Sequence, residues 1–415
     1  MLTSSVVTLC SLLMGARAGR VLHSDILSPA RNGLFEIDEV DRLRDATMPK
    51  VVAWMATKAG STNCTLENAA VRREWSDLSV AQREEYVQAV LCLQKKPPKA
   101  PRDKVPGSLS RYDDFVATHI TQAMLLHDPN HLFASHKYFI WSFEKALREE
   151  CGYTGYQPYM NYNRYAADPI NSPLFNGNSS SIGGNGAPDT YGGVPMPFRR
   201  PYDKIPPAGA GGCVTEGPFK DMVVSLGPMS TYLNGIPKNP RPDGLGSNPR
   251  CLRRDVNKFS IAGATANYTY MTIMNNTKID DFYNRYLGQP PLKNDPHPTS
   301  KQLHNAGHYT IGGGDPGGDF YASPGDPMFW FHHGMLDRVW WLWQMQDPEN
   351  RVHLIPGNGA QQMNMKHKTR GDAGEAATDP GETIVDLGWT APPAKLKDLN
   401  DQLGGLNGQF CYYYA

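Results

Sequence analysis

The segment from Asp326 to Gln344, DPMFWFHHGMLDRVWWLWQ, constrains the fold of this chain more than any other stretch. It places two adjacent histidines among aromatic and aliphatic residues, and an Asp-Arg pair lies four and five positions after the second histidine. A segment this apolar is expected inside a core, where an imidazole is costly to bury unless it has a partner. The rings of His332 and His333 are therefore either metal-bound or satisfied within the core.

The overall composition fits a folded protein with a sizeable core and no strongly charged partner. The chain has 415 residues, of which 40% are apolar, and its 41 basic side chains equal its 41 acidic ones. This balance gives no indication of a nucleic-acid partner or of an anionic membrane surface. Beyond the N-terminal segment, no apolar run approaches the roughly 20 residues of a membrane span. We interpret residues 19–415 as a single domain.

The N-terminus and the cysteines predict a secreted, extracellular protein. Residues 1–18 contain an apolar run, Val6 to Met14, and end in a small-x-small cleavage pattern, as in a signal peptide. Six cysteines remain after such a signal, which suits three disulfides whose 15 pairings the sequence leaves open. Four asparagines stand in sequons for glycosylation: Asn63, Asn178, Asn267 and Asn275.

Apolar residues recur with a helical period in several segments, at 79–93, 112–126, 133–148 and 326–344, with a shorter helix at 279–287. By contrast, residues 152–252 are rich in Gly, Pro, Asn and Tyr, and we expect loops there that wrap the frame. The sequence therefore predicts a mainly α fold, an antiparallel four-helix bundle with long irregular loops and few short strands.

Eight of the twelve histidines fall in two clusters: His119, His127, His131 and His136, and then His304, His308, His332 and His333. On a helix, the spacing of His304 and His308 puts both rings on one face, one turn apart. Residue 305 is Asn, not the Glu that a zinc protease uses as base, so that class is disfavoured. Two facing helix pairs could each supply three imidazoles. Two three-histidine sites without carboxylate or thiolate ligands fit copper best.

Three motifs resemble the type-3 copper proteins, the family of tyrosinases, catechol oxidases and hemocyanins. Residues 326–344 resemble its signature DPxFxxHHxxxDRxWxxWQ, and QLHNAGH at 302–308 resembles LHNxxH. HLFASHKYFIWSFEKALREECGY at 131–153 resembles FLPWHRYFLxxFExALRxECGY, with Ser135 replacing Trp and Lys137 replacing Arg. The resemblance implies two copper ions, with a copper A region at 112–150, a copper B region at 300–345, and O2 as co-substrate.

The resemblance also implies roles for individual residues. The expected ligands are His119, His127 and His136 for one copper, and His304, His308 and His333 for the other. Phe329, one turn before His333, would be an aromatic gate over the site, and Asn305 could polarise a bound water or phenol. His332 would point about 100° away from His333 on a helical wheel, and we do not expect it to reach the same metal. His131 matches no ligand position.

Two departures from the family pattern bear on the activity. No cysteine lies near His127 to form the Cys-His thioether of many relatives. No Glu occurs between Ile279 and His304, where many tyrosinases place one to hold a water that deprotonates a phenol. By resemblance Asn305 favours the hydroxylation of monophenols, whereas the missing Glu argues against it.

We therefore expect a secreted, copper-dependent oxidoreductase of the catechol oxidase or tyrosinase type. It would use O2 to oxidise o-diphenols (catechols) to o-quinones, and the hydroxylation of monophenols stays open. Its expected partners are small phenolic substrates and O2, with no nucleic acid and no membrane span. Two alternatives would use the same ligands: hemocyanin-like oxygen binding, and the oxidation of o-aminophenols or of a specific secondary metabolite.

Overall fold

The computed structural model describes residues 31–190, 192–195, 204–230, 235–287, 302–357 and 379–415. The predicted signal peptide, residues 1–18, lies outside the described residues. Within them the chain is mainly helical with a few short strands, which confirms the predicted fold class. No helix in this part of the chain is long and apolar enough to cross a membrane.

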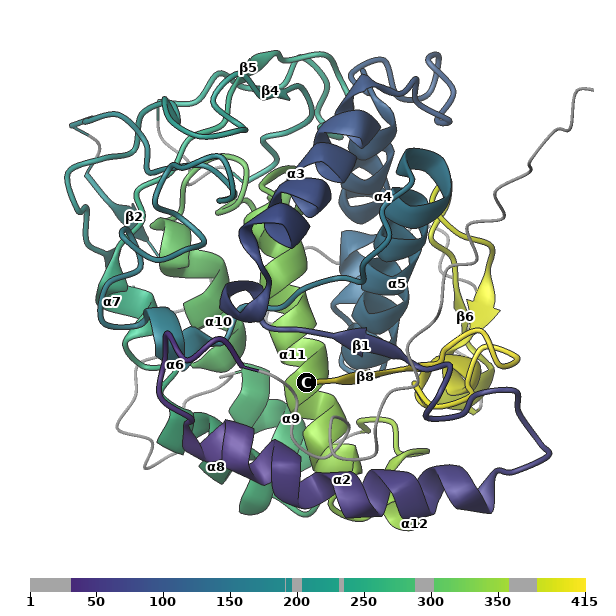
Figure 1. Cartoon of the computed structure of the whole chain (residues 1–415). Helices are drawn as coiled ribbons and strands as arrows, with labels where there is room; N and C mark the ends of the chain where they lie inside the picture. Colours follow the sequence, from purple (N-terminus) through teal and green to yellow (C-terminus); the bar gives the residue numbers. More distant parts are fainter. Residues whose placement is uncertain (1–30, 191, 196–203, 231–234, 288–301, 358–378) are drawn as a thin grey trace, which may run out of the picture.

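Four long helices form the centre of the molecule: α3 (Val80–Lys95), α4 (Arg111–Leu126), α5 (Leu132–Cys151) and α11 (Met328–Gln344). Helix α5 packs against α3, α4 and α11, and α4 also packs against α3. Figure 1 shows α11 running through the middle of the molecule. Every residue of α11 is buried, as its apolar character on all sides requires. These are the four long helices that the sequence predicts.

Local signals fix the ends of these helices within three residues of the predicted bounds. Ser79 and Ser110 each begin a helix with a capping box, in which the cap and the third helical residue satisfy each other's backbone N–H. Helix α5 ends at Gly152, which has a φ of 73°. Glycine adopts this left-handed conformation without steric cost.

Shorter helices surround the bundle: α6 (Tyr162–Tyr165), α7 (Lys258–Ile261), α8 (Ala266–Met274), α9 (Ile279–Leu287), α10 (Leu303–His308) and α12 (Pro348–Arg351). Helix α9 has the predicted bounds. Helix α10 contacts α11, α7 and α9, so the segment with His304 and His308 lies against the helix with His333.

The sequence did not predict α8 or the long helix α2 (Glu39–Thr57). Helix α2 contains Pro49 in its interior, which normally argues against a helix. It also buries Asp41, which is 2.9 Å from Arg338 of α11 and 3.2 Å from Arg164. The buried face of α2 is therefore partly ionic, and the search for an apolar period missed it.

The strands are short and occur in pairs. Within the predicted irregular region lie two antiparallel pairs: β2 (Val194–Pro195) with β3 (Lys204–Ile205), and β4 (Val223–Val224) with β5 (Arg250–Cys251). A third pair joins β6 (Ile384–Val385) to β7 (Ala394–Lys395). Strand β1 (Ala70–Arg72) pairs in parallel with β8 (Tyr412–Tyr414), so the C-terminal segment lies beside an early part of the chain.

Three disulfides confirm the number that the cysteine count predicts: Cys64–Cys411, Cys92–Cys151 and Cys213–Cys251. The second joins α3 to the end of α5. The first fixes the C-terminal segment immediately before β8. This segment lies against α11, where the hydroxyls of Tyr412 and Tyr414 donate hydrogen bonds to Asp337.

Candidate metal centre

The structure gathers seven histidines into two groups. Group A consists of His119, His127 and His136, and group B of His304, His308, His332 and His333. Within each group, one ring nitrogen per residue lies within 4.8 Å of the others. Group A comes from α4, the residue that ends α4, and α5. Group B comes from α10 and α11. All six histidines predicted as ligands are thus brought together as two sets.

In group A, backbone carbonyls fix all three rings. The Nδ1 atom of His119 is 2.6 Å from the carbonyl oxygen of Tyr321. His127 and His136 each direct Nδ1 at the carbonyl four residues earlier, at 2.7 and 2.9 Å. A carbonyl only accepts, so each Nδ1 must carry the proton and each Nε2 has a free lone pair. The Nε2 atoms of His119 and His136 are buried without a partner. This is how imidazoles are presented to a metal.

In group B, the rings of α10 and α11 meet directly. The Nε2 atoms of His333 and His308 are 3.2 Å apart. Two nitrogens bound to one transition metal at about 2.0–2.1 Å in a tetrahedral arrangement would be separated by about 3.3 Å. Both ring nitrogens of His304 lack a hydrogen-bond partner. The donor set of group B therefore also fits a metal that prefers imidazole, as copper does.

Burial keeps these rings in the form that binds a metal. Desolvation lowers the pKa of His119 and of His304 to about 4, although Asn305 opposes the shift at His304. Desolvation, followed by the neighbouring imidazoles, lowers the pKa of the other rings further below the ordinary value. Neutral imidazole is the ligand form. Buried ring nitrogens with unpaired lone pairs are costly unless a partner binds them, and a metal cation is such a partner.

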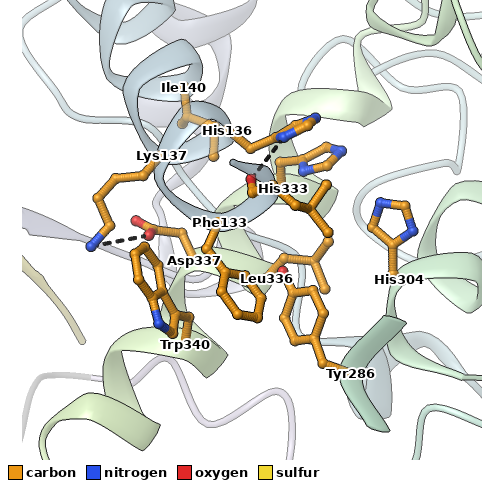
Figure 2. A pocket seen from close by; sticks show the side chains of 11 residues that line it. Phe133, His136, Lys137, Ile140, Tyr286, His304, His333, Leu336, Asp337 and Trp340 are labelled. Atoms are coloured by element: carbon orange, nitrogen blue, oxygen red, sulfur yellow. Dashed lines mark hydrogen bonds and ion pairs between the residues drawn. The ribbon is translucent and has the colours of Figure 1, made fainter. Parts of the chain in front are cut away.

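The two groups face each other closely enough for a dinuclear site. The rings of His136 and His333 stack with centroids 4.5 Å apart and an interplanar angle of 16°. The centroids of His127 and His304 are 6.4 Å apart. Figure 2 shows His136, His333 and His304 on the wall of one cavity. Group A and group B thus form one centre built from two helix pairs, as the sequence analysis expected.

His332 lies closer to the other rings of group B than the helical wheel alone indicates, and its exclusion from the copper ligands stays a prediction. Its ring centroid is 4.7 Å from that of His333 and 4.3 Å from that of His308. A 100° step around a helix still leaves neighbouring side chains this close when both are confined by a second helix. The Nδ1 atom of His332 is 2.7 Å from the hydroxyl of Tyr162. The ring also packs on Gly307, where a Cβ atom would come within 2.0 Å of Nδ1.

Phe329 occupies the interior of the site, not its mouth. It is 1% exposed, and its ring lies 4.2 Å from His333 and 5.4 Å from His119, between centroids. Phe329 is the second residue of α11. A buried ion pair between Asp326 and Arg254 holds the start of this helix inside the protein. Phe329 therefore lies within the site, whereas a gate would lie at its entrance.

A recess reaches group A and group B from another direction. It is lined by His127, His304, Asn305, His308, Tyr309, Gly317, Gly318, Asp319, Phe320 and Ser323. Phe320 is half-buried, and its ring centroid is 4.4 Å from that of His127. Phe320 is thus an aromatic residue of the recess that lies directly beside His127. The sequence analysis missed it because the segment GGDFYASPGD has no helical or strand period to orient its side chains.

Two other predicted residues have clear positions. Asn305 is 5% exposed and lines the recess next to His304. His131 belongs to neither group: it precedes α5, and its Nδ1 is 3.6 Å from the carboxylate of Asp128. Its placement agrees with the expectation that it is not one of the clustered ligands.

Comparison with known proteins identifies the class. Residues 109–346 match the family model described as the common central domain of tyrosinase. The chain therefore belongs to the tyrosinase family and is a copper-dependent oxidoreductase. Members of this family act on phenolic substrates with O2 as co-substrate. The matched residues include both histidine groups and all of α11.

The chain is similar to several fungal proteins. It is 43% identical over 306 residues to the tyrosinase-like protein orsC of Emericella nidulans, covering 71% of this chain and 79% of that one. It is 32% identical over 374 residues to the N-acetyl-6-hydroxytryptophan oxidase ivoB of the same organism, covering 85% and 93%. Among solved structures, a variant of the polyphenol oxidase from Thermothelomyces thermophila matches with a TM-score of 0.79 at 35% identity, covering 91% and 98%.

Proposed function

We propose that this protein is an o-diphenol oxidase with two copper ions, one held by His119, His127 and His136, the other by His304, His308 and His333. The observation that carries the proposal is the pair of facing imidazole groups, in which group A has every Nδ1 bonded to a carbonyl. When bound, copper supplies the redox chemistry, in which two diphenols give four electrons to one O2 and yield two quinones and two waters.

His333 is preferred to His332 as the third ligand of group B. The Nε2 atom of His333 already lies 3.2 Å from that of His308. The ring of His332 is instead packed against Gly307 of α10, where a Cβ atom would come within 2.0 Å of its Nδ1. We therefore assign His332 to holding α10 against α11, and His333 to the metal.

The residues of the recess bind and orient the phenol. Phe320 offers an aromatic edge beside His127, against which a substrate ring can pack. Asn305 has both a donor and an acceptor at the recess, so it can orient a phenol hydroxyl next to His304. Phe329, packed beneath the rings of both groups, keeps water from their inner side.

Oxidation of diphenols is favoured over hydroxylation of monophenols because the recess offers no free base among its described residues. Its one carboxylate, Asp319, accepts hydrogen bonds from the backbone N–H groups of Met229, Ser230 and Tyr321 and from the Ser230 hydroxyl. These hydrogen bonds hold the carboxylate to the protein backbone and to Ser230. A diphenol ionises more readily and needs less help.

A dedicated secondary metabolite is the second candidate substrate. The observation in its favour is the 32% identity, over most of both chains, to an N-acetyl-6-hydroxytryptophan oxidase. The same copper ligands would serve, and only the residues of the recess would differ. Substrates of this kind belong in the test panel.

We also propose that the protein is secreted and glycosylated. Three disulfides are typical of an oxidising compartment. The four sequon asparagines, Asn63, Asn178, Asn267 and Asn275, all have exposed positions in the structure. A shift to lower mass when the protein from culture medium is treated with an endoglycosidase would support this, and an unchanged mass would contradict the glycosylation.

The test of the main proposal is a quinone assay with the copper-loaded protein. A matched pair of substrates, 4-methylcatechol and 4-methylphenol, should give quinone rapidly from the first and slowly or not at all from the second. Oxygen uptake should amount to one O2 for every two diphenols. Reversible O2 binding without any quinone would favour the oxygen carrier. Quinone from an o-aminophenol or a hydroxyindole alone would favour the dedicated oxidase.

A further inference from the structure

A second cavity lies behind the histidines, inside the helix bundle. It is lined by residues of α5, α9, α10 and α11, among them His136, Lys137, His304, His333 and Asp337. Figure 2 shows Lys137 and Asp337 on one side, His304 on the other, and the rings of His136 and His333 along one wall. The cavity has room for about one water molecule. The recess described above shares only His304 with it.

Asp337 presents an unsatisfied oxygen there. Its Oδ2 atom accepts hydrogen bonds from the hydroxyls of Tyr412 and Tyr414, at 2.8 and 2.6 Å, and from Arg72 at 3.3 Å. Its Oδ1 atom has no hydrogen-bond partner, and the side chain is only 3% exposed. A buried carboxylate oxygen without a donor is destabilising. A donor in the cavity would remove this destabilisation.

Lys137 places a positively charged group near the same oxygen of Asp337. Its side chain is fully buried, and Nζ donates to the carbonyl of Asn400 at 2.8 Å. The distance from Nζ to Asp337 Oδ1 is 3.8 Å, which is too long for a direct hydrogen bond. A polar contact at this distance is the usual setting for a bridging water. A second N–H of the ammonium group is available for it.

The third polar group on the wall is His333. Its Nε2 atom faces His308, so Nδ1 is the nitrogen that must carry the proton. No group in the described part of the chain hydrogen-bonds that Nδ1, whereas all three Nδ1 atoms of group A have a carbonyl. Metal-ligating histidines almost always give the second N–H to an acceptor. Asp337 lies one helical turn after His333, on the same face of α11.

We propose that one ordered water occupies this cavity and links Asp337 to His333. The water accepts hydrogen bonds from Lys137 Nζ and His333 Nδ1 and donates one to Asp337 Oδ1. Asp337 is thereby a positioning residue that orients the His333 imidazole through the water. Tyr412 and Tyr414 of strand β8 hold the other carboxylate oxygen, Oδ2, and take no part in the link through the water. The inference rests on the proposed assignment of His333 as a copper ligand.

The direct test is a crystal structure of the copper-loaded protein at about 1.8 Å resolution or better. A well-ordered water should lie within about 3.2 Å of Asp337 Oδ1, Lys137 Nζ and His333 Nδ1. A cavity without ordered density, or a water that does not reach His333, would overturn the proposal. If copper and the water are both found but no quinone is formed, the proposed function fails and this inference stands.

The variant Asp337→Asn tests the role in solution. Three donors surround Oδ2, so the amide must turn its oxygen there and its NH2 group toward the cavity. The water would then face three donors, from Lys137, His333 and the new amide, and would lose its acceptor. We expect the group B copper to bind about ten- to a hundredfold more weakly, with the group A copper unchanged. Both are measured by following copper transfer to a chelator.

Tyr412→Phe is the matched control. It removes one hydrogen bond to Oδ2 and so perturbs the same carboxylate, but it leaves Oδ1 and the water in place. Copper retention should stay within about twofold of the unmodified protein. Equal losses in the two variants, or equal losses from both groups in Asp337→Asn, would reduce Asp337 to a general structural role. If Asp337→Asn does not fold, the crystal structure alone decides.

Discussion

The two halves of the metal centre are built differently. In group A, the rings of His127 and His136 are bonded to carbonyls of the same turn of backbone, and His119 to Tyr321. In group B, two rings come from α10, a helix of six residues, and neither ring nitrogen of His304 has a hydrogen-bond partner. Group A is therefore organised by backbone geometry, whereas group B depends on side-chain packing between α10 and α11. We therefore expect group A and group B to respond differently to mutation and to metal removal.

The largest effect is expected from replacing a ring of group B. His333→Ala removes the ligand that faces His308, and one copper per chain should be lost together with the oxidase activity. His332→Ala should keep both coppers, because His332 is assigned to packing. Metal analysis and the quinone assay on both variants check this. The reverse outcome would show that His332 is the ligand.

The two coppers should also leave at different rates. When the reduced, copper-loaded protein is exposed to a copper(I) chelator, group B should lose its ion first, by a factor of about ten or more. The reason is that hydrogen-bonded second nitrogens contribute about ten- to a hundredfold to metal affinity. Anomalous scattering from partly depleted crystals locates the remaining ion. Loss from group A first would contradict the comparison.

Acid should destabilise the metal-free protein. The folded-state pKa of His119 and of His304 is lowered to about 4, below the unfolded value of about 6.5. The unfolded chain therefore binds more protons between these values, and the free energy of unfolding falls as the pH is lowered from about 6.5 to 4. At about 1.4 kcal/mol per pKa unit, the loss should be a few kcal/mol. Urea unfolding at several pH values measures it, and a flat profile would argue against buried neutral rings.

A smaller effect is expected from Tyr162→Phe. This change removes the hydroxyl that lies 2.7 Å from His332 Nδ1 and leaves a buried nitrogen without its partner, at a cost of about 1–3 kcal/mol. Because His332 packs between α10 and α11, copper should leave group B severalfold faster, with little change in group A. The chelator experiment measures both rates. Equal acceleration of the two rates would mean that Tyr162 supports the fold in general.

The smallest effect is expected at the recess. Phe320→Ala removes the aromatic ring beside His127 without touching a nitrogen that could bind metal. The KM for a catechol should rise by a few-fold while kcat and the copper content stay close to those of the unmodified protein. Phe329→Ala is the comparison, because that ring is buried between the two groups and its loss should lower the copper content. If the two variants changed the KM and the copper content in the same way, the different placement of Phe320 and Phe329 would be contradicted.

Local patterns and motifs allowed much of this molecule to be predicted. The four long helices are rich in apolar residues, and α3 and α4 also begin with capping boxes. The six clustered histidines stand at spacings that bring them together once these helices and α10 form. Helix α2 escaped prediction because its buried face is partly ionic, with Asp41 paired to Arg338. The pairing of the cysteines depends on tertiary structure, which spacing along the chain does not reveal.

The positions of Phe320, Phe329 and His332 could not be predicted for a related reason. A helical wheel gives the direction of His332 but not the presence of Gly307, whose missing side chain lets the ring lie against α10. Phe329 looked like a gate because its spacing from His333 fits one, yet the burial of the start of α11 is a tertiary property. Phe320 lies in an irregular segment, where side-chain direction has no local rule.

The central claim is that two facing histidine groups, unequal in construction, bind a pair of copper ions. Metal analysis of freshly prepared protein, compared with His333→Ala, tests this most directly. The account predicts two coppers per chain in the unmodified protein and one in the variant, retained by His119, His127 and His136. One copper or none in the unmodified protein, or two in the variant, would contradict it.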